Sequence, residues 1–233
     1  MTPPIVLLAL GSWEQHGAHL PFDTDTVIIE SVVDAAIRSV DPNNTQFSVV
    51  PTIGVTASDE HNGFAGTLSI GTNALSDAVV SIARSASWAR GICIVNGHGG
   101  NAEAVAVAAV DAQAESGIPV AAATYWHMAG DAFAPILERQ SNVLHACEAE
   151  ASMVMALLPE AVRPARLSEQ HGPHSTRVEG QPPALARRRS FKELSANGVI
   201  GDARSATAAK GEALLDAAAE RIARDLANPK LWG

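Results

Sequence analysis

The sequence feature that most constrains the fold is an alternation of short apolar runs with longer segments of helical periodicity. A continuous apolar run that ends at a glycine, such as Ile5 to Leu10 before Gly11, is typical of a strand buried on both faces of a parallel sheet. From Thr26 to Val40, by contrast, apolar residues recur at the spacing of a helix. The alternation continues along the chain and predicts strands at 5–10, 47–50, 92–95 and 119–124. It predicts helices at 26–40, 72–90, 148–158 and 206–226, and a further helix that follows the glycine turn after the third strand and ends near residue 117.

This pattern predicts an α/β fold of three layers, α/β/α, in which helices cover both faces of a mainly parallel sheet. A chain of 233 residues has the size of one large α/β domain, and no segment marks a domain boundary, so residues 1–233 are expected to form a single domain. Functional groups in such folds gather beyond the carboxyl ends of the strands. His16, Asp25, His98 and His127 each follow a predicted strand and are expected at that edge.

The charge balance argues against several kinds of partner. With 25 acidic and 16 basic residues, the chain has a formal net charge of −9 and no basic field that would gather nucleic acid or an anionic membrane surface. The first apolar run is too short for a signal peptide or a membrane span, so we expect a cytoplasmic protein. Cys93 and Cys147 are expected to be reduced packing residues.

A dense polar segment follows the first predicted strand. From Glu14 to Asp25 the chain contains three carboxylates and two imidazoles. In an extended segment Glu14 and His16 point to the same side, and Gly17 and Pro21 let the chain turn back and bring Asp25 beside them. Such a set of ligands suits divalent Zn, Mn or Fe. The alternative is a solvated polar loop in which Asp25 caps the next helix.

A histidine in a glycine turn is the second candidate. His98 stands between Gly97 and Gly99 on a strand-to-helix turn, where it could bind metal or move protons. Such a turn could instead hold a phosphate on its backbone N–H groups, although the Walker lysine and a Gly-x-Gly-x-x-Gly sequence are both absent. A core histidine bonded to a neighbouring carbonyl is the third alternative.

The third candidate group surrounds the start of a predicted helix. If the helix already includes His145, Glu148 lies one turn from it and Glu150 lies about 140° around the axis, because a helix has about 3.6 residues per turn. If the helix begins nearer Cys147, His145 lies in the preceding loop and Glu150 is free to face the site. One of the two glutamates could also simply complement the helix dipole.

Together these segments resemble the successive motifs of the creatininase family of metal-dependent amidohydrolases. The resemblance extends over about residues 5–158, and the motifs stand in the order of the family. They are Gly11-Ser12-x-Glu14-Gln15-His16-Gly17-x-His19-Leu20-Pro21-x-x-Thr24-Asp25, Phe64-x-Gly66-Thr67-x-Ser69, Asn96-Gly97-His98-Gly99-Gly100-Asn101 and His145-Ala146-x-x-x-Glu150-x-Ser152.

The resemblance implies an α/β/α fold with a dinuclear metal centre. It implies that Glu14, His16 and His98 are ligands and that Asp25 bridges two divalent ions, which would be Zn, Fe or Mn. The chain departs from the creatinine-hydrolysing members in one place, because these carry Tyr-Glu where this chain has two glycines, Gly99-Gly100.

In those members, that glutamate is a ligand of the second metal. Its absence argues against creatinine as the substrate and leaves one coordination position to be filled from elsewhere. Our candidate for this position is Glu150, with Glu148 in reserve.

Within the family, the sequence is similar to peptidases that remove a C-terminal Val-Tyr dipeptide from a modified ribosomal precursor peptide. This similarity implies a small peptide substrate and a closed homo-oligomer. It depends on the segments Gly11–Gly17, Glu60–Phe64 and Asn197–Asp202.

The implied reaction is amide hydrolysis by a hydroxide held between the two metal ions. His145 and Glu150 are the candidate catalytic residues, with His145 stabilising the carbonyl oxygen and protonating the leaving amine. We expect His61, or His127 beside Trp126, to form the wall of the substrate pocket.

Three alternatives remain open at this point. A deformylase-like member of the family would act on a small formamide or a cyclic amide, and would release formate rather than a dipeptide. A non-catalytic member would bind metal without hydrolysing amides. A phosphate-binding module would keep its ligand affinity in the presence of a chelator.

A long irregular segment, residues 159–201, is expected to be either mobile or a lid on the substrate side. It contains Glu169-Gln170-His171-Gly172, which repeats the Glu-Gln-His-Gly sequence of the first polar cluster. No Thr-Asp pair follows this repeat, so it is interpreted as chance or as a loop on the substrate side.

Overall fold

A four-stranded parallel sheet lies at the centre of the computed structural model, which describes residues 2–43, 45–175 and 189–233. The strands follow the order β2-β1-β3-β4, and Ile5 pairs with Phe47 on one side and with Gly91 on the other. The prediction of a parallel sheet is therefore confirmed. The strands are β1 (Ile5–Leu10), β2 (Phe47–Val49), β3 (Gly91–Asn96) and β4 (Val120–Thr124).

Helices connect the strands and also follow the last one. The α-helices are α1 (Thr24–Ser39), α2 (Gly71–Ser85), α3 (Ala102–Ser116), α4 (Tyr125–Ala129), α5 (Glu148–Leu157), α6 (Phe191–Leu194) and α7 (Ala208–Leu226). Short 3-10 turns complete the described elements: η1 (Asp59–His61), η2 (Gly99–Asn101), η3 (Gly130–Ala132), η4 (Pro159–Ala161), η5 (Pro164–Glu169) and η6 (Pro229–Leu231).

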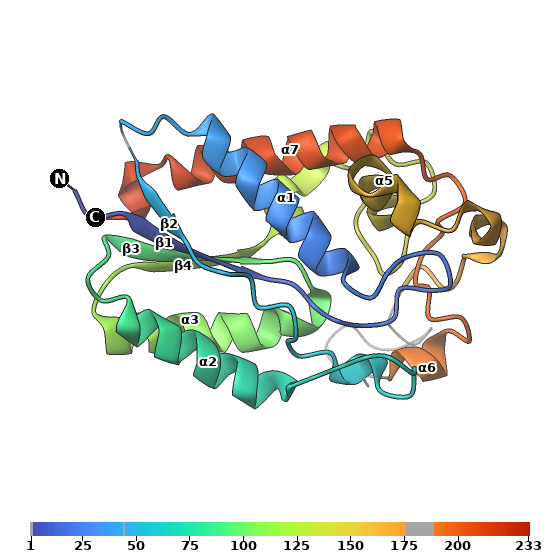
Figure 1. Ribbon diagram of the computed structural model, residues 1–233, viewed down its shortest axis with the longest axis horizontal. Helices are drawn as coiled ribbons and strands as arrows, with labels where there is room; N and C mark the ends of the chain where they lie inside the picture. The colour runs from blue at the N-terminus through green and yellow to red at the C-terminus, as the bar shows by residue number, and fades with distance from the viewer. Residues whose placement is uncertain (1, 44, 176–188) are drawn as a thin grey trace.

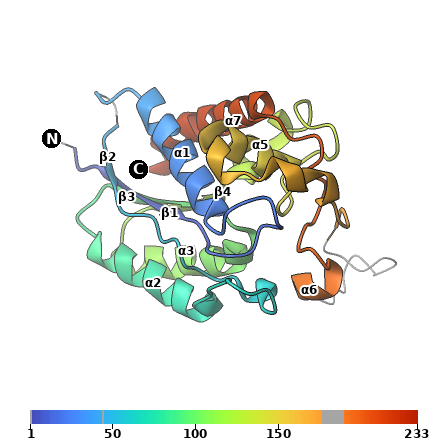
Figure 2. The same cartoon turned by 45° about the vertical axis from the view of Figure 1, so that its right-hand side comes forward.

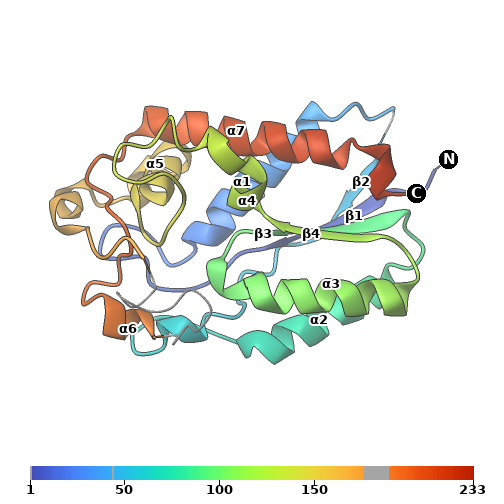
Figure 3. The same cartoon turned by 180° about the vertical axis from the view of Figure 1, so that it is seen from behind.

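The sheet separates two layers of helices, as Figures 1 and 3 show. All six residues of β1 are buried, and alternate ones face opposite layers. Ile5 and Leu7 pack in a core with residues of α1, α5 and α7, whereas Val6 and Leu8 pack in a second core with residues of α2 and α3. This double burial explains why the strand sequence is a continuous apolar run. The predicted three-layer α/β/α arrangement is confirmed.

The expected end of the second helix was wrong. The pattern predicted a helix at 72–90 capped by Thr72, but α2 spans Gly71–Ser85, its N-cap position is Ile70, and no side chain caps it. Ala86 and Ala89 are buried beyond the end of the helix, so the apolar pattern continues where the helix does not. The differences at the other element ends are of one or two residues.

The topology places a switch point at the carboxyl edge of the sheet, between β1 and β3. Because β1 lies between β2 and β3, the connections from β1 and from β3 lead away to opposite sides, and ligands bind at such switch points in open α/β sheets. In Figure 1 this edge faces α5 and α6, away from both termini, and Figure 2 brings its loops forward. Among the described residues, no helix is both long and apolar enough to cross a membrane.

Candidate metal centre

Four parts of the fold bring the candidate residues together at this edge. Glu14 and His16 lie in the loop after β1, and Asp25 is in the first turn of α1. His98 follows β3, and Glu150 is in the first turn of α5. All five side chains are buried, as a site closed to bulk water requires.

The loop after β1 folds back tightly on the start of α1. A Cβ atom at Gly11 would lie 2.2 Å from Thr26 Oγ1, so only glycine permits this approach. The Ser12 hydroxyl donates a hydrogen bond to Asp25 Oδ2 at 2.7 Å, and Glu14 N–H donates to the carbonyl oxygen of Phe22 at 3.0 Å. These contacts place Asp25 beside the residues that follow the strand.

The turn after β3 is held by its two asparagines. The Asn96 side chain accepts from His98 N–H at 3.1 Å and donates to the His98 carbonyl at 2.7 Å, so it clamps both ends of the histidine backbone. Asn101 donates to the carbonyl of Gly11 at 3.1 Å and accepts from Ala57 N–H at 3.1 Å. The turn thereby positions His98 against the loop that follows β1.

The start of α5 decides between the two glutamates. The helix begins at Glu148, and Ala146 just before it has a φ of 52°, so His145 lies in the preceding loop. Glu150 turns back and accepts from Ala146 N–H at 2.5 Å. Glu148 instead faces away and accepts from Lys210 Nζ at 2.6 Å. The position of Glu150 is that expected of our candidate ligand, and Glu148 is engaged elsewhere.

Two groups of possible ligands share Asp25. Glu14, Asp25 and His98 form one group, and His16, Asp25 and Glu150 form the other, with the ligand atoms of each within 4.8 Å of one another. Asp25 Oδ2 lies 3.1 Å from His98 Nδ1, and Asp25 Oδ1 lies 3.4 Å from His16 Nε2. Two different oxygens therefore face the two groups.

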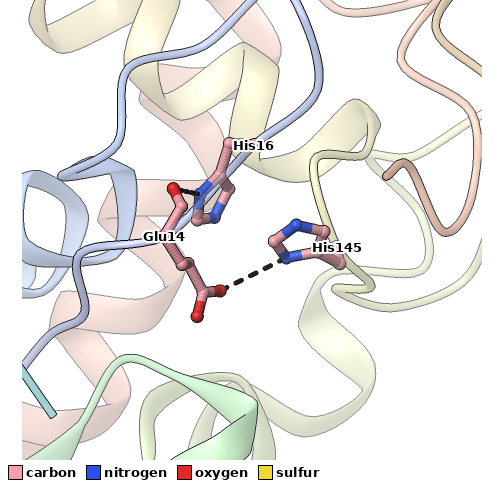
Figure 4. A group of neighbouring side chains, drawn as sticks. All are labelled: Glu14, His16 and His145. Carbon is pink, nitrogen blue, oxygen red and sulfur yellow. Dashed lines mark hydrogen bonds and ion pairs between the residues drawn. The ribbon is translucent and has the colours of Figure 1, made fainter. Parts of the chain in front are cut away.

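Two further histidines line the same space. Figure 4 shows His145 opposite Glu14 and His16, with Nδ1 3.5 Å from Glu14 Oε1. His61, from η1, has its Nε2 3.2 Å from the same carboxylate oxygen. Phe191 of α6 packs against both rings, with centroid distances of 4.2 Å to His61 and 5.0 Å to His145.

Within the described ranges, the carboxylates of Glu14, Asp25 and Glu150 have only histidines as ion-pair partners. Burial raises the pKa of Glu14 above its usual value and raises that of Glu150 to about 8. Burial acts against the charge on His16, but Asp25 and Glu150 outweigh it and raise the pKa of His16 to about 9. Glu14 and Asp25 likewise overcome burial at His98 and raise its pKa well above the usual value.

The two histidines on the other side of the space behave differently. Burial, together with neighbouring imidazoles, lowers the pKa of His61 to about 2 and that of His145 well below its usual value. Both rings are therefore neutral, and a neutral imidazole can bind a cation or accept a proton.

The donor set fits divalent cations. Both oxygens of Glu14 and the Nε2 atom of His16 are buried without a hydrogen-bond partner, and such atoms are costly unless something binds them. Carboxylate oxygens and imidazole nitrogens are the ligands that Zn and Mn take in proteins. A cation would also replace the protons that the metal-free site holds on His16 and Glu150.

The structure adds a carboxylate that the sequence analysis did not select. Glu60 Oε1 lies 3.2 Å from His98 Nε2. A Cβ atom at Gly100 would come within 2.1 Å of that same oxygen. Glu60 thus fills the space next to the position where creatinine-hydrolysing members carry their glutamate. Its only signal in the sequence is its place beside His61.

The expected pocket wall is placed only in part. His61 faces the site, and Phe191 supplies an aromatic face there that sequence reasoning missed. Trp126 packs against the core between the sheet and α7, and His127 is exposed. Neither belongs to a group of possible ligands among the described residues, so their contact with substrate stays a prediction.

The repeated Glu-Gln-His-Gly stretch lies beside the metal loop without joining it. Gln170 is buried, and its Oε1 atom accepts from Ala18 N–H at 3.2 Å. His171 is exposed and pairs with Asp202 in an isolated bridge. This stretch therefore supports the loop from outside. Part of the expected mobile or lid segment, residues 176–188, lies outside the described residues.

The family of this chain follows from comparison with known proteins. The family model for creatininase, described as creatinine amidohydrolase, matches residues 2–226. The chain therefore belongs to the creatininase family, and it is a hydrolase that acts on amide bonds.

Its similarity to particular members is also clear. The mycofactocin precursor peptide peptidase of Mycobacterium ulcerans (strain Agy99) is 37% identical over 232 residues, which cover 96% of this chain and 86% of the relative. The protein of the same name from Mycolicibacterium smegmatis is 35% identical over 227 residues, with 95% and 85% covered.

Solved structures agree on the fold. A mutant creatininase of the Zn-Zn type has a TM-score of 0.79 at 24% identity, with 96% of this chain and 89% of that chain covered. A manganese creatininase has a TM-score of 0.75 at 23% identity, with 96% and 90% covered.

Proposed function

We propose that this chain is a metal-dependent peptidase that removes a C-terminal Val-Tyr dipeptide from a modified mycofactocin precursor peptide. The observation that carries the proposal is the pair of ligand groups that share Asp25 in a chain whose relatives are named as peptidases of that precursor. The absence of a glutamate at Gly100, where Glu60 fills the neighbouring space, argues against creatinine as the substrate.

The residues present would hold two divalent cations, Zn, Fe or Mn. Glu14 and His98 would bind one, His16 and Glu150 would bind the other, and Asp25 would bridge them. When bound, such ions polarise a carbonyl and lower the pKa of a water ligand to about 7.

The protein groups around this centre have separate tasks. His145 would take up a proton at Nδ1, which faces Glu14, and pass it to the leaving amine. His61 and Phe191 would form the wall against which the scissile amide lies. Burial of the whole group excludes bulk water from the reacting atoms.

Mass spectrometry of the peptide after incubation with metal-loaded protein tests the proposal. We expect loss of the C-terminal dipeptide, with no product when a chelator is present. His145→Ala should keep its metal content but hydrolyse about 10²-fold more slowly or worse, because it lacks the proton carrier.

Other products would contradict the proposal in different ways. Release of formate from a formamide, with the peptide left intact, would indicate a deformylase. Bound metal without hydrolysis of either substrate would indicate a non-catalytic member. We also propose a homo-oligomer, which light scattering would reveal as a mass that is a multiple of 24.2 kDa.

A further inference from the structure

One buried glutamine lies between the two neutral histidines of the site. Gln15 Nε2 is 3.0 Å from His61 Nδ1, 3.1 Å from His145 Nε2 and 3.1 Å from the carbonyl oxygen of Gly198. Its other amide atom, Oε1, accepts from Gly17 N–H at 3.0 Å. The orientation of the amide is thereby fixed, because Gly17 N–H can only donate and the Gly198 carbonyl can only accept.

The hydrogen atoms in this group can then be assigned by counting. The Gln15 amide has two hydrogens, and one must go to Gly198. His145 Nε2 also lies 2.8 Å from the backbone carbonyl oxygen of Gln15, which can only accept. His145 therefore carries its hydrogen on Nε2 and donates it to that carbonyl. The second amide hydrogen of Gln15 is left for His61 Nδ1.

The opposite assignment leaves groups unsatisfied. If Gln15 donated to His145 Nε2, the Gln15 carbonyl would face a bare nitrogen at 2.8 Å. His61 Nδ1 would then face an amide nitrogen that cannot accept a hydrogen bond. A buried site that contains two such contacts is unfavourable, and the first assignment contains neither.

We propose that Gln15 is a positioning residue that sets which ring nitrogen of each histidine carries hydrogen, so that His145 offers an acceptor and His61 a donor to the reacting atoms. His145 presents a bare Nδ1, 3.5 Å from Glu14 Oε1, where it can accept a proton. His61 presents an Nε2–H, 3.2 Å from the same oxygen, where it can donate a hydrogen bond to the oxygen of the scissile carbonyl. The catalytic consequence rests on the proposed function, but the assignment of hydrogens does not.

Gln15 also connects three segments that are distant in the sequence. The segments 11–17, 60–64 and 197–202, which carry the likeness to the peptidases, contribute Gln15, His61 and Gly198. Gly198 has a φ of 81°, and a Cβ atom there would lie 2.0 Å from Gln15 Oε1. The glycine is therefore needed for both its conformation and its lack of a side chain.

Solid-state ¹⁵N NMR of the zinc-loaded protein, labelled at histidine, tests the assignment directly. His61→Asn and His145→Asn identify the signals of the two rings. In the unmodified protein we expect both rings to carry hydrogen on Nε2 and not on Nδ1. In Gln15→Met, which offers no donor, and in Gln15→Glu, whose carboxylate only accepts, His61 Nδ1 should gain a proton.

A matched control separates this effect from a general disturbance of the loop. Gln170 is also buried and accepts from the same loop at Ala18 N–H, so Gln170→Met removes a comparable side chain. The signals of His61 and His145 should be unchanged in this control. Hydrogen on Nδ1 of His61 in the unmodified protein, or an unchanged spectrum in both Gln15 variants, would overturn the proposal.

Kinetics provide a second readout. Gln15→Met should lower kcat for the peptide by about 10²-fold, as loss of one donor to a developing oxyanion does, with KM little changed. A loss confined to KM would contradict the role of Gln15. If the peptide proves not to be the substrate, the NMR result still decides the positions of the hydrogens.

Discussion

Asp25 directs its two carboxylate oxygens at two different histidines, at 3.1 Å from His98 and 3.4 Å from His16. A carboxylate shared between two cations needs this arrangement. The Ser12 hydroxyl bonds one of these oxygens at 2.7 Å and fixes the plane of the group. At the scale of single residues, Asp25 is therefore the group on which both metal positions depend.

The Asp25→Asn variant should fold but lose most of its metal. An amide nitrogen cannot bind a cation, so we expect elemental analysis to fall from about two equivalents per chain to one or fewer. Asp34→Asn is the matched control, because Asp34 is exposed on the same helix and its ion pair is with Arg38, at 3.8 Å. Unchanged metal content in Asp25→Asn would contradict the shared position.

Metal binding should release protons. The pKa of His16 is raised to about 9 and that of Glu150 to about 8, so both hold a proton in the metal-free protein at pH 7. The pKa of His98 is also raised well above its usual value. Calorimetric titration with Zn in buffers of different ionisation heat should therefore show release of at least two protons per chain at pH 7 and fewer at pH 10. The affinity should rise with pH through this range.

The same shifts set how the stability of the metal-free protein depends on pH. In the folded protein the pKa of His16 lies above its ordinary value of 6.5, and the pKa of Glu150 lies above its ordinary value of 4.5. The folded state therefore holds these two protons more tightly than the unfolded state. Their stabilisation is present at low pH and is lost as pH rises through about 8 and 9. A metal-free protein that becomes more stable between pH 7 and pH 10 would contradict these assignments.

The residues that could be predicted from sequence are those that follow buried strands. Glu14, His16 and His98 stand directly after apolar runs, so their side of the sheet was predictable. Gln15 follows the same strand as Glu14 and His16, but its role has no local signal, because it depends on His61 and His145, which are 46 and 130 positions away. Glu60 likewise depends on its contact with His98, 38 positions away. Such contacts depend on how loops meet, which no local pattern records.

At the scale of elements, the turn that ends in η2 joins strand, ligand and helix in six residues, Asn96 to Asn101. The side chains of its two asparagines replace the hydrogen bonds that a strand or helix would supply. The two glycines of η2, Gly99 and Gly100, have different roles. A Cβ atom at Gly99 would meet nothing within 4 Å, whereas one at Gly100 would lie 2.5 Å from the Ala57 carbonyl and 2.4 Å from His98 Nε2.

Gly100→Ala should therefore weaken both folding and metal binding. Overpacking of this kind costs about 1–3 kcal/mol, and the displacement of His98 should lower the affinity for Zn more than tenfold. Gly99→Ala is the matched control and should leave both quantities close to those of the unmodified protein. Denaturant titration and calorimetry measure the two effects, and equal behaviour of the two variants would refute this account of the turn.

Element boundaries show where sequence reasoning ends. The start of α5 at Glu148 agrees with the predicted helix at 148–158, but the sequence left open whether the helix includes His145. The buried Ala146 adopts a φ of 52°, a conformation usually taken by glycine, and this keeps His145 outside the helix. The end of α2 could not be predicted because Ala86 and Ala89 continue the apolar pattern beyond Ser85. The strands β1 and β3 were predicted closely, since a fully buried strand leaves a continuous apolar run.

At the scale of the whole molecule, the candidate centre brings together groups that are far apart in the sequence. Its groups come from the loop after β1, from α1, from the turn after β3 and from α5. The assignment of residues 1–233 to one domain stays a prediction. If it is right, metal bound at this place should stabilise the entire chain.

Calorimetric melting tests this coupling. We expect one cooperative transition in the metal-loaded protein, and a lower Tm after chelation. At a free metal concentration of 100 times Kd, binding adds about 2.7 kcal/mol, which corresponds to roughly 5–10 °C for a chain of this size. Two separate transitions, or identical curves with and without metal, would contradict the expectation.

The order of the ligands along the chain has a consequence for how the centre forms during synthesis. Glu14, His16, Asp25 and His98 all precede β4, whereas Glu150 follows it, at the start of α5. A nascent polypeptide that has just emerged to the end of β4 thus has the groups for one cation, but the second position still lacks Glu150. With the proposed ligand set, capture of the second ion is therefore expected only after the ribosome has delivered the later part of the protein.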